Sequence, residues 1–165
     1  MAVTTDIVAT WRRPGTVMRR LLSMGRREDR ALAMLIAACL VIFVAQWPRL
    51  SREAFFDPSV PLEARLGGAL LGWLFIAPLM AYAVAAIGHL LALIVKGKGS
   101  WYSSRLALFW SLLSTSPAFL FYGLVAGFIG PGIEQSLAGG LLLIAFLAIW
   151  GLCLREAERE PEAGA

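Results

Sequence analysis

Four long stretches of the sequence contain no Asp, Glu, Lys or Arg, and they limit what the chain can fold into. These stretches cover residues 31–47, 66–95, 106–130 and 137–154. A bilayer core about 30 Å thick is crossed by roughly 20 apolar helical residues, so each stretch comes close to the length of a span. None alternates with the two-residue period of a strand, and an open sheet leaves backbone groups unpaired in lipid. We therefore expect an all-α membrane protein with four transmembrane helices, at about 31–47, 66–95, 104–130 and 137–154.

The composition agrees with a bilayer environment. Hydrophobic residues make up 59% of the 165 positions and charged residues 16%, whereas soluble domains are nearer half apolar and a quarter charged. The formal net charge of +4 raises the question of nucleic acid, but the basic residues lie between apolar stretches and not along one exposed face. We expect the partners to be the lipid bilayer and other integral membrane proteins, with no nucleic acid.

Few residues in the apolar stretches are suited to chemistry. Cys39 and Cys153 both lie inside them, where a free thiol behaves as a small hydrophobic group. Two isolated cysteines and the single histidine, His89, provide neither a disulfide framework nor a metal-ligand spacing. Membrane enzymes and ion-coupled carriers usually place ionisable residues inside their spans. The sequence therefore predicts a protein that is not an enzyme, with no catalytic residue, no metal and no cofactor.

The chain divides into three parts. Residues 1–30 form a basic cytoplasmic or interfacial N-terminal segment, residues 31–154 a helical transmembrane domain, and residues 155–165 a polar cytoplasmic tail. The longer connections, 48–65 and 96–105, are too short to fold as separate domains.

Prolines interrupt two of the expected spans. As one helix, residues 66–95 would be about 45 Å long, so this span must tilt, bend near Pro78 or extend beyond the lipid. In the third span Pro117 removes a helix hydrogen bond, and the hydroxyls of Ser114 and Thr115 are able to bond the freed carbonyls. The alternative is a hairpin of two short helices, each only about 20 Å long and too short to cross. We expect one span, kinked at Pro117.

Seven arginines precede the first apolar stretch, in "WRRPGTVMRRLLSMGRREDR" at residues 11–30. Lys and Arg concentrate in the cytoplasmic loops of membrane proteins. With the N-terminus inside, the inner segments hold twelve basic residues and the outer loops three. We therefore expect a multi-pass protein of the bacterial inner (cytoplasmic) membrane with both termini in the cytoplasm.

The same segment has a weak amphipathic pattern. Apolar residues recur at helical spacing from Val17 to Leu22, while Pro14 suits a first helical turn and Gly25 a helix end. Such a helix can lie on an anionic leaflet, where each arginine contributes about 1 kcal/mol. The other interpretation is a set of orientation charges with no recognition role. The membrane-surface candidates are Arg12, Arg13, Arg19, Arg20, Arg26 and Arg27.

His89 is the one candidate for binding a cofactor. Its spacing from Ala85, A-x-x-x-H, resembles light-harvesting polypeptides, in which a histidine binds the magnesium of a bacteriochlorophyll. On this interpretation Ala85 leaves room for a flat macrocycle against the helix. The structural interpretation is that His89, six residues before Lys96, interacts with the last carbonyls of its helix. We expect His89 to be dispensable for folding and to bind no chromophore, because the sequence shows no polar group beside it.

Two glycine pairs are candidates for close helix packing. Gly68 and Gly72, and likewise Gly123 and Gly127, are spaced four residues apart, and small residues at this spacing let helix backbones approach closely in lipid. Each pair can serve either the protein's own bundle or a partner helix.

Three stretches resemble the bacterial branch of the Yip (Ypt-interacting protein) family of integral membrane proteins. They are "PGTVMRRLLSMGRREDRALAML" (14–35), "LALFWSLLSTSP" (106–117) and "LCLREAE" (152–158). The resemblance implies a polytopic α-helical membrane protein with a cytoplasmic N-terminus and no known catalytic residues. After the third stretch this chain ends in a polar tail, where the family has a fifth helix.

These observations favour a non-enzymatic inner-membrane protein of Yip type, an accessory or organising component that acts through helix–helix contacts with other membrane proteins. One alternative is a small-molecule or lipid permease that uses the bent second and third helices. Another is a pigment- or haem-binding subunit that uses His89.

Overall fold

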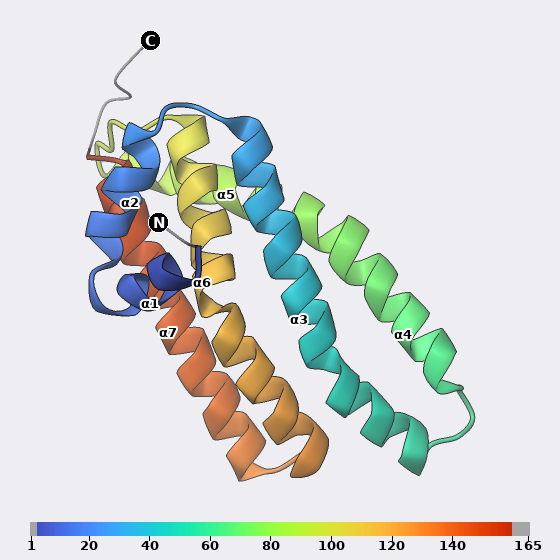
Figure 1. The fold of residues 1–165 in the computed structure, drawn as a ribbon. Coiled ribbons are helices and arrows are strands. Elements are labelled where there is room, and N and C mark those ends of the chain that lie inside the picture. The colour runs from blue at the N-terminus through green and yellow to red at the C-terminus, as the bar shows by residue number, and fades with distance from the viewer. Residues whose placement is uncertain (1–2, 160–165) are drawn as a thin grey trace.

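The computed structural model describes residues 3–159, and across these residues the chain is helical, without a strand (Figure 1). Four helical stretches are long and apolar enough to cross a membrane: α3, the continuous α4–η1–α5 stretch, α6 and α7. The expectation of an all-α protein with four transmembrane helices is thus confirmed. The elements are α1 (Val3–Arg12), α2 (Pro14–Ser23), α3 (Glu28–Phe56), α4 (Leu62–Leu71), the π-helical η1 (Gly72–Ile76), α5 (Ala77–Ile94), α6 (Trp101–Phe128) and α7 (Ile133–Ala157).

The first long helix continues past the position where we expected it to end. The connection expected at 48–65 is in fact only 57–61, because α3 runs through Pro48. A proline inside a helix removes one backbone hydrogen bond, but here its ring lies against Gly127 of α6, where any Cβ would overlap it. Arg52, one turn further, donates to the Gly127 carbonyl at 3.3 Å. These contacts with α6 hold the helix together beyond the proline.

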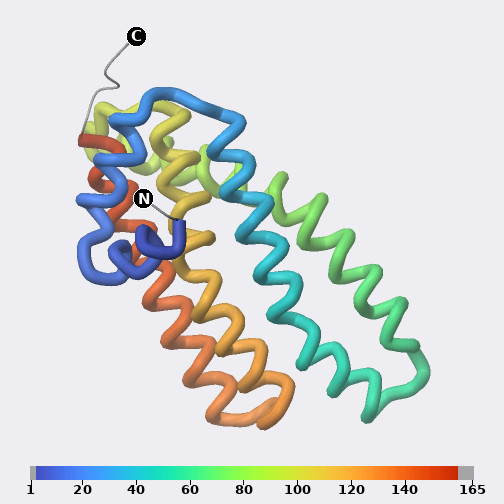
Figure 2. Tube along the Cα trace, viewed as in Figure 1, coloured from blue at the N-terminus to red at the C-terminus, as the bar shows by residue number. Residues whose placement is uncertain are grey.

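The second stretch bends at a π-helical turn. In η1 the backbone opens to i→i+5 bonding, and the N–H of Ala77 donates to the carbonyl of Gly72. Pro78 follows directly, so the wider turn lies where the proline ring would crowd an α-helix. Figure 2 shows α5 leaving the direction of α4 and passing behind α6 toward the end at which α7 finishes.

The third stretch is a single helix, so the hairpin alternative is wrong. The carbonyl of Leu113, which Pro117 leaves without its usual donor, accepts a 2.7 Å bond from the hydroxyl of Ser116. The sequence favours Ser114 and Thr115 for this role, but their hydroxyls bond to carbonyls earlier in the helix, at 2.8 and 2.7 Å. Only the side chain directly before the proline is close enough to the freed group.

The N-terminal helices pack against the bundle with their apolar faces. Trp110 of α6 donates from Nε1 to the hydroxyl of Thr10 at 3.0 Å, and Trp11 donates from Nε1 to the Ser114 carbonyl at 2.9 Å. The α2 helix packs on α7, and Met18 is fully buried. The apolar face expected to lie on lipid is therefore used inside the protein.

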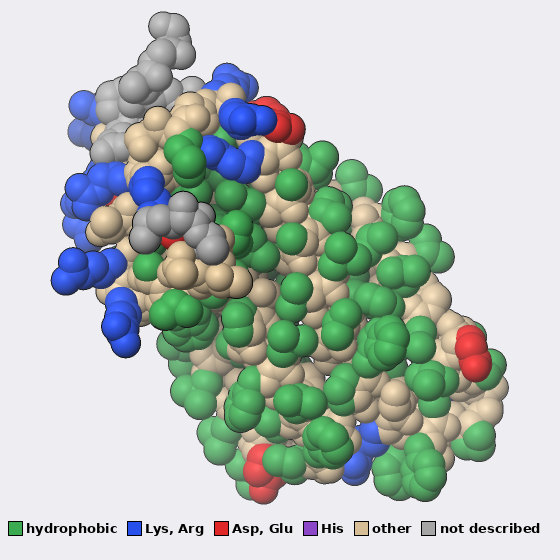
Figure 3. All heavy atoms as spheres, in the orientation of Figure 1, with side chains coloured by type: hydrophobic (Ala, Val, Ile, Leu, Met, Phe, Trp, Pro, Cys, Tyr) green, Lys and Arg blue, Asp and Glu red, His purple; other side chains and the backbone are tan. Residues whose placement is uncertain are grey.

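Basic side chains gather over the end of the molecule that carries α1 and α2, while hydrophobic side chains cover the long sides of the bundle in this view (Figure 3). The α6 helix is the central one: half of its most apolar 18 residues are buried, and it packs chiefly between α3 and α7. A 28-residue helix is about 42 Å long, so α6 exceeds a bilayer core of about 30 Å. Its first turns, which contact Arg27 and Glu28 at the start of α3, thus extend beyond the lipid when its last turns lie within it.

Candidate functional site

A buried histidine–glutamate pair lies at the arginine-rich end of the bundle. Nδ1 of His89, in the last third of α5, is 2.9 Å from Oε1 of Glu158, which directly follows α7. Their side chains are only 4% and 6% exposed. With Glu158 ionised, Nδ1–H of His89 is the donor of this bond and the carboxylate oxygen is the acceptor. The pair joins the ends of two helices that also meet at Gly88, where a Cβ would lie 3.0 Å from the Trp150 ring.

The loop after α5 closes around the same carboxylate. The N–H of Gly99 donates to Oε2 of Glu158 at 3.0 Å, and the N–H of Lys98 donates to the Glu158 carbonyl at 2.8 Å. A Cβ at Gly97 would lie 2.6 Å from Oε2, and one at Gly99 would lie 2.5 Å from the carbonyl oxygen of Ala157. Both glycines of "KGKGS" are therefore needed because the loop backbone touches the end of α7.

These contacts change the interpretation of His89. We expected no polar group beside it, and Glu158 contradicts that premise, because a residue of the expected polar tail folds back onto α5. The ring of Trp101 packs on the His89 ring with centroids 4.5 Å apart. Ala85, which was expected to leave room for a macrocycle, is 1% exposed, and its carbonyl accepts a 3.2 Å bond from Ser104. The helix face proposed for a pigment is filled by α6.

The two glycine pairs have different environments. A Cβ at Gly123 would overlap the carbonyl of Ala45, and one at Gly127 would overlap Pro48, so this pair lets α6 approach α3. At Gly68 and Gly72 a Cβ would meet no other atom within 4 Å. The second pair is therefore open.

The six candidate arginines do not form one cluster. Four have acidic partners: Arg19 pairs with Glu156 at 3.0 Å, Arg20 with Asp6 at 2.5 Å, Arg26 with Glu28 at 3.7 Å and Arg27 with Asp29 at 2.8 Å.

Arg27 also shows an electrostatic effect of its partner. The hydrogen bonds that Arg27 donates to Asp29, and the charge of that carboxylate, raise the pKa of the Arg27 guanidinium above its ordinary value. Arg27 is thus held in a local ion pair at the start of α3.

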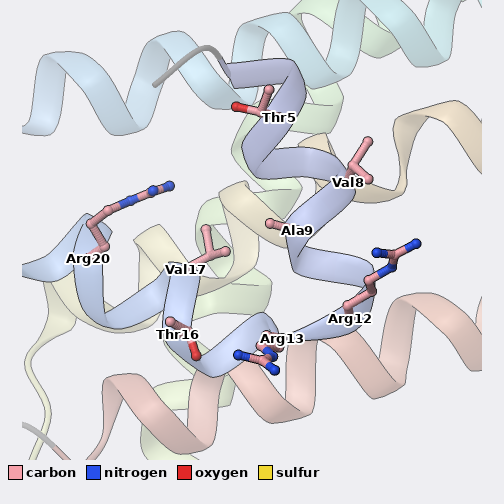
Figure 4. Close-up of a pocket in the computed structure, with 8 residues that line it drawn as sticks. All are labelled: Thr5, Val8, Ala9, Arg12, Arg13, Thr16, Val17 and Arg20. Carbon is pink, nitrogen blue, oxygen red and sulfur yellow. The ribbon is translucent and has the colours of Figure 1, made fainter.

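The other two arginines line a pocket of about 530 Å³ between α1 and α2 (Figure 4). In Figure 4 the side chains of Arg12, Arg13 and Arg20 extend in different directions and do not converge on one point. A single anion would therefore not meet all three guanidinium groups here.

Sequence reasoning missed Glu158, Trp101 and the acceptor at Leu113. The signal for Glu158 was the alternating glycines of "KGKGS", which indicate a close backbone approach without naming its partner. The helix α7 also continues to Ala157, into the expected tail 155–165, of which 160–165 lie outside the described residues. Residues 1–2 of the N-terminal segment likewise lie outside them.

The fold and this helix-end arrangement define a multi-pass α-helical membrane protein. No group of three or more His, Cys, Asp and Glu side chains suited to a metal ion occurs among residues 3–159. No protein-family model, characterised protein or solved structure matches the chain.

Proposed function

We propose that the protein is a non-enzymatic accessory component of Yip type in the bacterial inner membrane, which organises other membrane proteins through helix–helix contacts. The observation that carries this proposal is the open glycine face of α4 and η1. Gly67, Gly68 and Gly72 all face open space, whereas the other pair of this spacing, Gly123 and Gly127, is filled by α3.

Glycine is an unfavourable choice for a helix surface that only meets lipid, because it lacks apolar area and weakens the helix by roughly 1 kcal/mol relative to alanine. In membranes such residues let a second backbone approach closely. The α4 helix packs chiefly on α3, so its glycine face is available to a helix of another protein. The partner fits this face by presenting small side chains of its own.

The orientation belongs to the same proposal. Basic side chains gather at one end of the bundle (Figure 3), and an even number of spans brings both ends of the chain to one side. By the positive-inside tendency this side is the cytoplasm.

Photo-crosslinking in cells tests the proposal. A benzoylphenylalanine placed at Leu71, which is exposed beside the glycines, should give discrete protein adducts. The matched probe at Leu143, similarly exposed on α7, measures the background of adducts formed by random encounters with other membrane proteins. Gly68→Ile should remove the Leu71 adducts while the protein accumulates normally. Adducts that are the same from both probes, or that survive Gly68→Ile, would count against an accessory role for this face.

A second candidate, the permease, is favoured by an open apolar pocket of about 490 Å³ on the side of the bundle, which Gly72 also borders. It lies between α3, η1, α5, α6 and α7, and its lining includes Ile42, Trp73, Met80, Leu112 and Phe146. The apolar lining suits a lipid tail or another apolar molecule. Reconstituted vesicles with a fluorescent lipid in the inner leaflet test it: lipid that becomes accessible to an external quencher faster than in empty vesicles would favour the permease over the accessory protein.

A further inference from the structure

A groove of about 670 Å³ separates the second half of α5 from the end of α7. Its walls are apolar, with Leu91 from α5 and Leu147, Trp150 and Leu154 from α7. Gly88 forms part of one wall, and a Cβ there would lie 3.0 Å from the Trp150 ring. The groove thus offers a continuous hydrocarbon surface between two helices.

Three basic side chains line the same groove at its loop end. Lys96, Arg155 and Arg159 are all exposed, and none has an ion pair or side-chain hydrogen bond among residues 3–159. Glu158 also borders the groove, but its two carboxylate oxygens are bound to His89 and to the N–H of Gly99. Three cations therefore face one carboxylate that is already engaged, and the mouth is positively charged.

Lys96 occupies an unusual backbone conformation at the edge of the groove. Its φ of 62° lies in the left-handed region, which glycine adopts more easily and which normally follows a helix end. A glycine is the next residue, yet lysine occupies the left-handed position. The side chain at this turn borders the groove, where it adds positive charge.

The length of the groove matches one leaflet. From Leu147 to the end of α7 at Ala157 the groove follows 10 residue steps, or about 15 Å of helix, with Arg159 two residues further on, and half a bilayer core is also about 15 Å. An anionic group bound among the basic residues would place an attached hydrocarbon chain along the apolar wall as far as the bilayer centre.

We propose that this groove binds one anionic phospholipid, with its phosphate among Lys96, Arg155 and Arg159 and an acyl chain against Leu91, Leu147 and Leu154. The bound lipid spans the gap between α5 and α7, beside the His89–Glu158 pair. This proposal does not depend on the glycine face of α4 or on a protein partner.

Native mass spectrometry of the full-length protein in mild detergent tests the proposal, with phosphatidylglycerol and phosphatidylethanolamine of identical chains as probes. The parent should retain one phosphatidylglycerol in preference to phosphatidylethanolamine. Arg155→Gln combined with Arg159→Gln should weaken that binding roughly 10- to 30-fold. Each basic residue near an anionic headgroup raises the affinity by about three- to five-fold, and the double variant removes two of them. The control, Arg12→Gln with Arg13→Gln, removes the same charge at the same end of the molecule and should leave binding unchanged.

A second pair of variants tests the apolar part. Gly151 lines the groove and Gly140 lies on the same helix outside it, and a Cβ at either position meets no other atom within 4 Å. Gly151→Leu should fill the groove and abolish retention of the lipid, whereas Gly140→Leu should behave as the parent. Glycerol phosphate should not compete, because it has no chain. Equal binding of the two lipids, equal losses from the two arginine pairs, retention by Gly151→Leu, or competition by glycerol phosphate would each overturn the proposal.

Discussion

Nδ1 of His89 lies 2.9 Å from Oε1 of Glu158, although the two residues are 69 positions apart in the chain. The bond fixes the end of α7 to α5, and the loop at 97–99 closes over it through the N–H of Gly99. A helix end that would otherwise fray in solvent is thereby held against the bundle.

We expect the loss of this pair to destabilise the protein. Glu158→Ala leaves His89 and the Gly99 N–H without their acceptor in a buried place, and should lower the free energy of unfolding by about 2–3 kcal/mol. His89→Ala should have a smaller effect than Glu158→Ala, since it leaves one carboxylate contact intact. Thermal unfolding in detergent, followed by circular dichroism, measures both. If both variants melt with the parent, the pair is not a structural tie.

The glycine pairs should respond differently to a branched side chain. Gly123→Ile meets the backbone of Ala45, which a rotamer change does not relieve, and we expect a loss of about 3 kcal/mol or failure to accumulate. Gly72→Ile meets open space and should insert and melt like the parent. The two variants make the same substitution, each within a helical stretch able to cross the membrane, so each serves as the other's control. Equal destabilisation of both would contradict the assigned environments.

The hydroxyl of Ser116 should matter for the passage of α6 through Pro117. Ser116→Ala leaves the buried Leu113 carbonyl without a donor, and we expect a loss of about 1–2 kcal/mol. Ser136→Ala removes a hydroxyl–carbonyl bond of similar kind at an exposed position and should change stability by less than about 0.5 kcal/mol. Denaturation in a detergent–urea series compares the two, and a larger effect at Ser136 would argue against the role given to Ser116.

The connection between α3 and α4 should show a pH dependence. The hydroxyl and the N–H of Ser59 bond to the Asp57 carboxylate, and with Arg65 they lower the pKa of Asp57 below its ordinary value of 3.8. Because the folded pKa lies below the unfolded one, the stabilisation is present above about pH 4 and is lost as the pH falls through the folded value. A carboxyl-carbon NMR titration should place the Asp57 midpoint below 3.8. In Ser59→Ala the midpoint should move upward, and an unchanged midpoint would show that Ser59 is not the main cause.

The sequence predicted those parts of the structure that depend only on moving uncharged stretches from water into lipid. Long uncharged stretches have to be helical in lipid, and for this reason the four spans and the all-α class followed directly. The end of α3 did not, because continuation through Pro48 depends on a glycine 79 residues later that makes room for the proline ring. Propensity rules treat a proline locally, and the contact that decides the outcome is tertiary.

The same reason explains the candidate site. A lone histidine in an apolar stretch gives no indication of its partner. Glu158 lies in a polar tail without apolar residues at helical spacing, so nothing in the sequence indicates that it packs against the bundle. The arginine-rich segment was interpreted as a membrane-surface helix because Val17 and Leu21 form an apolar stripe. A stripe fits lipid and protein equally well, and its burial against α7 follows only from the arrangement of the bundle.

The contact of Trp11 with the Ser114 carbonyl has a consequence for biosynthesis, because the two residues are separated by 103 positions. At about 5–20 residues per second, a ribosome needs roughly 5–20 s to make the chain between them. During that time α1 and α2 exist while α6 and α7, against which they pack, are still being synthesised or inserted. The helices α1 and α2 therefore leave the ribosome before α6 and α7 but reach their native position only after them. Until then their apolar faces are exposed, so chaperones and the membrane surface have access to them before the rest of the protein does.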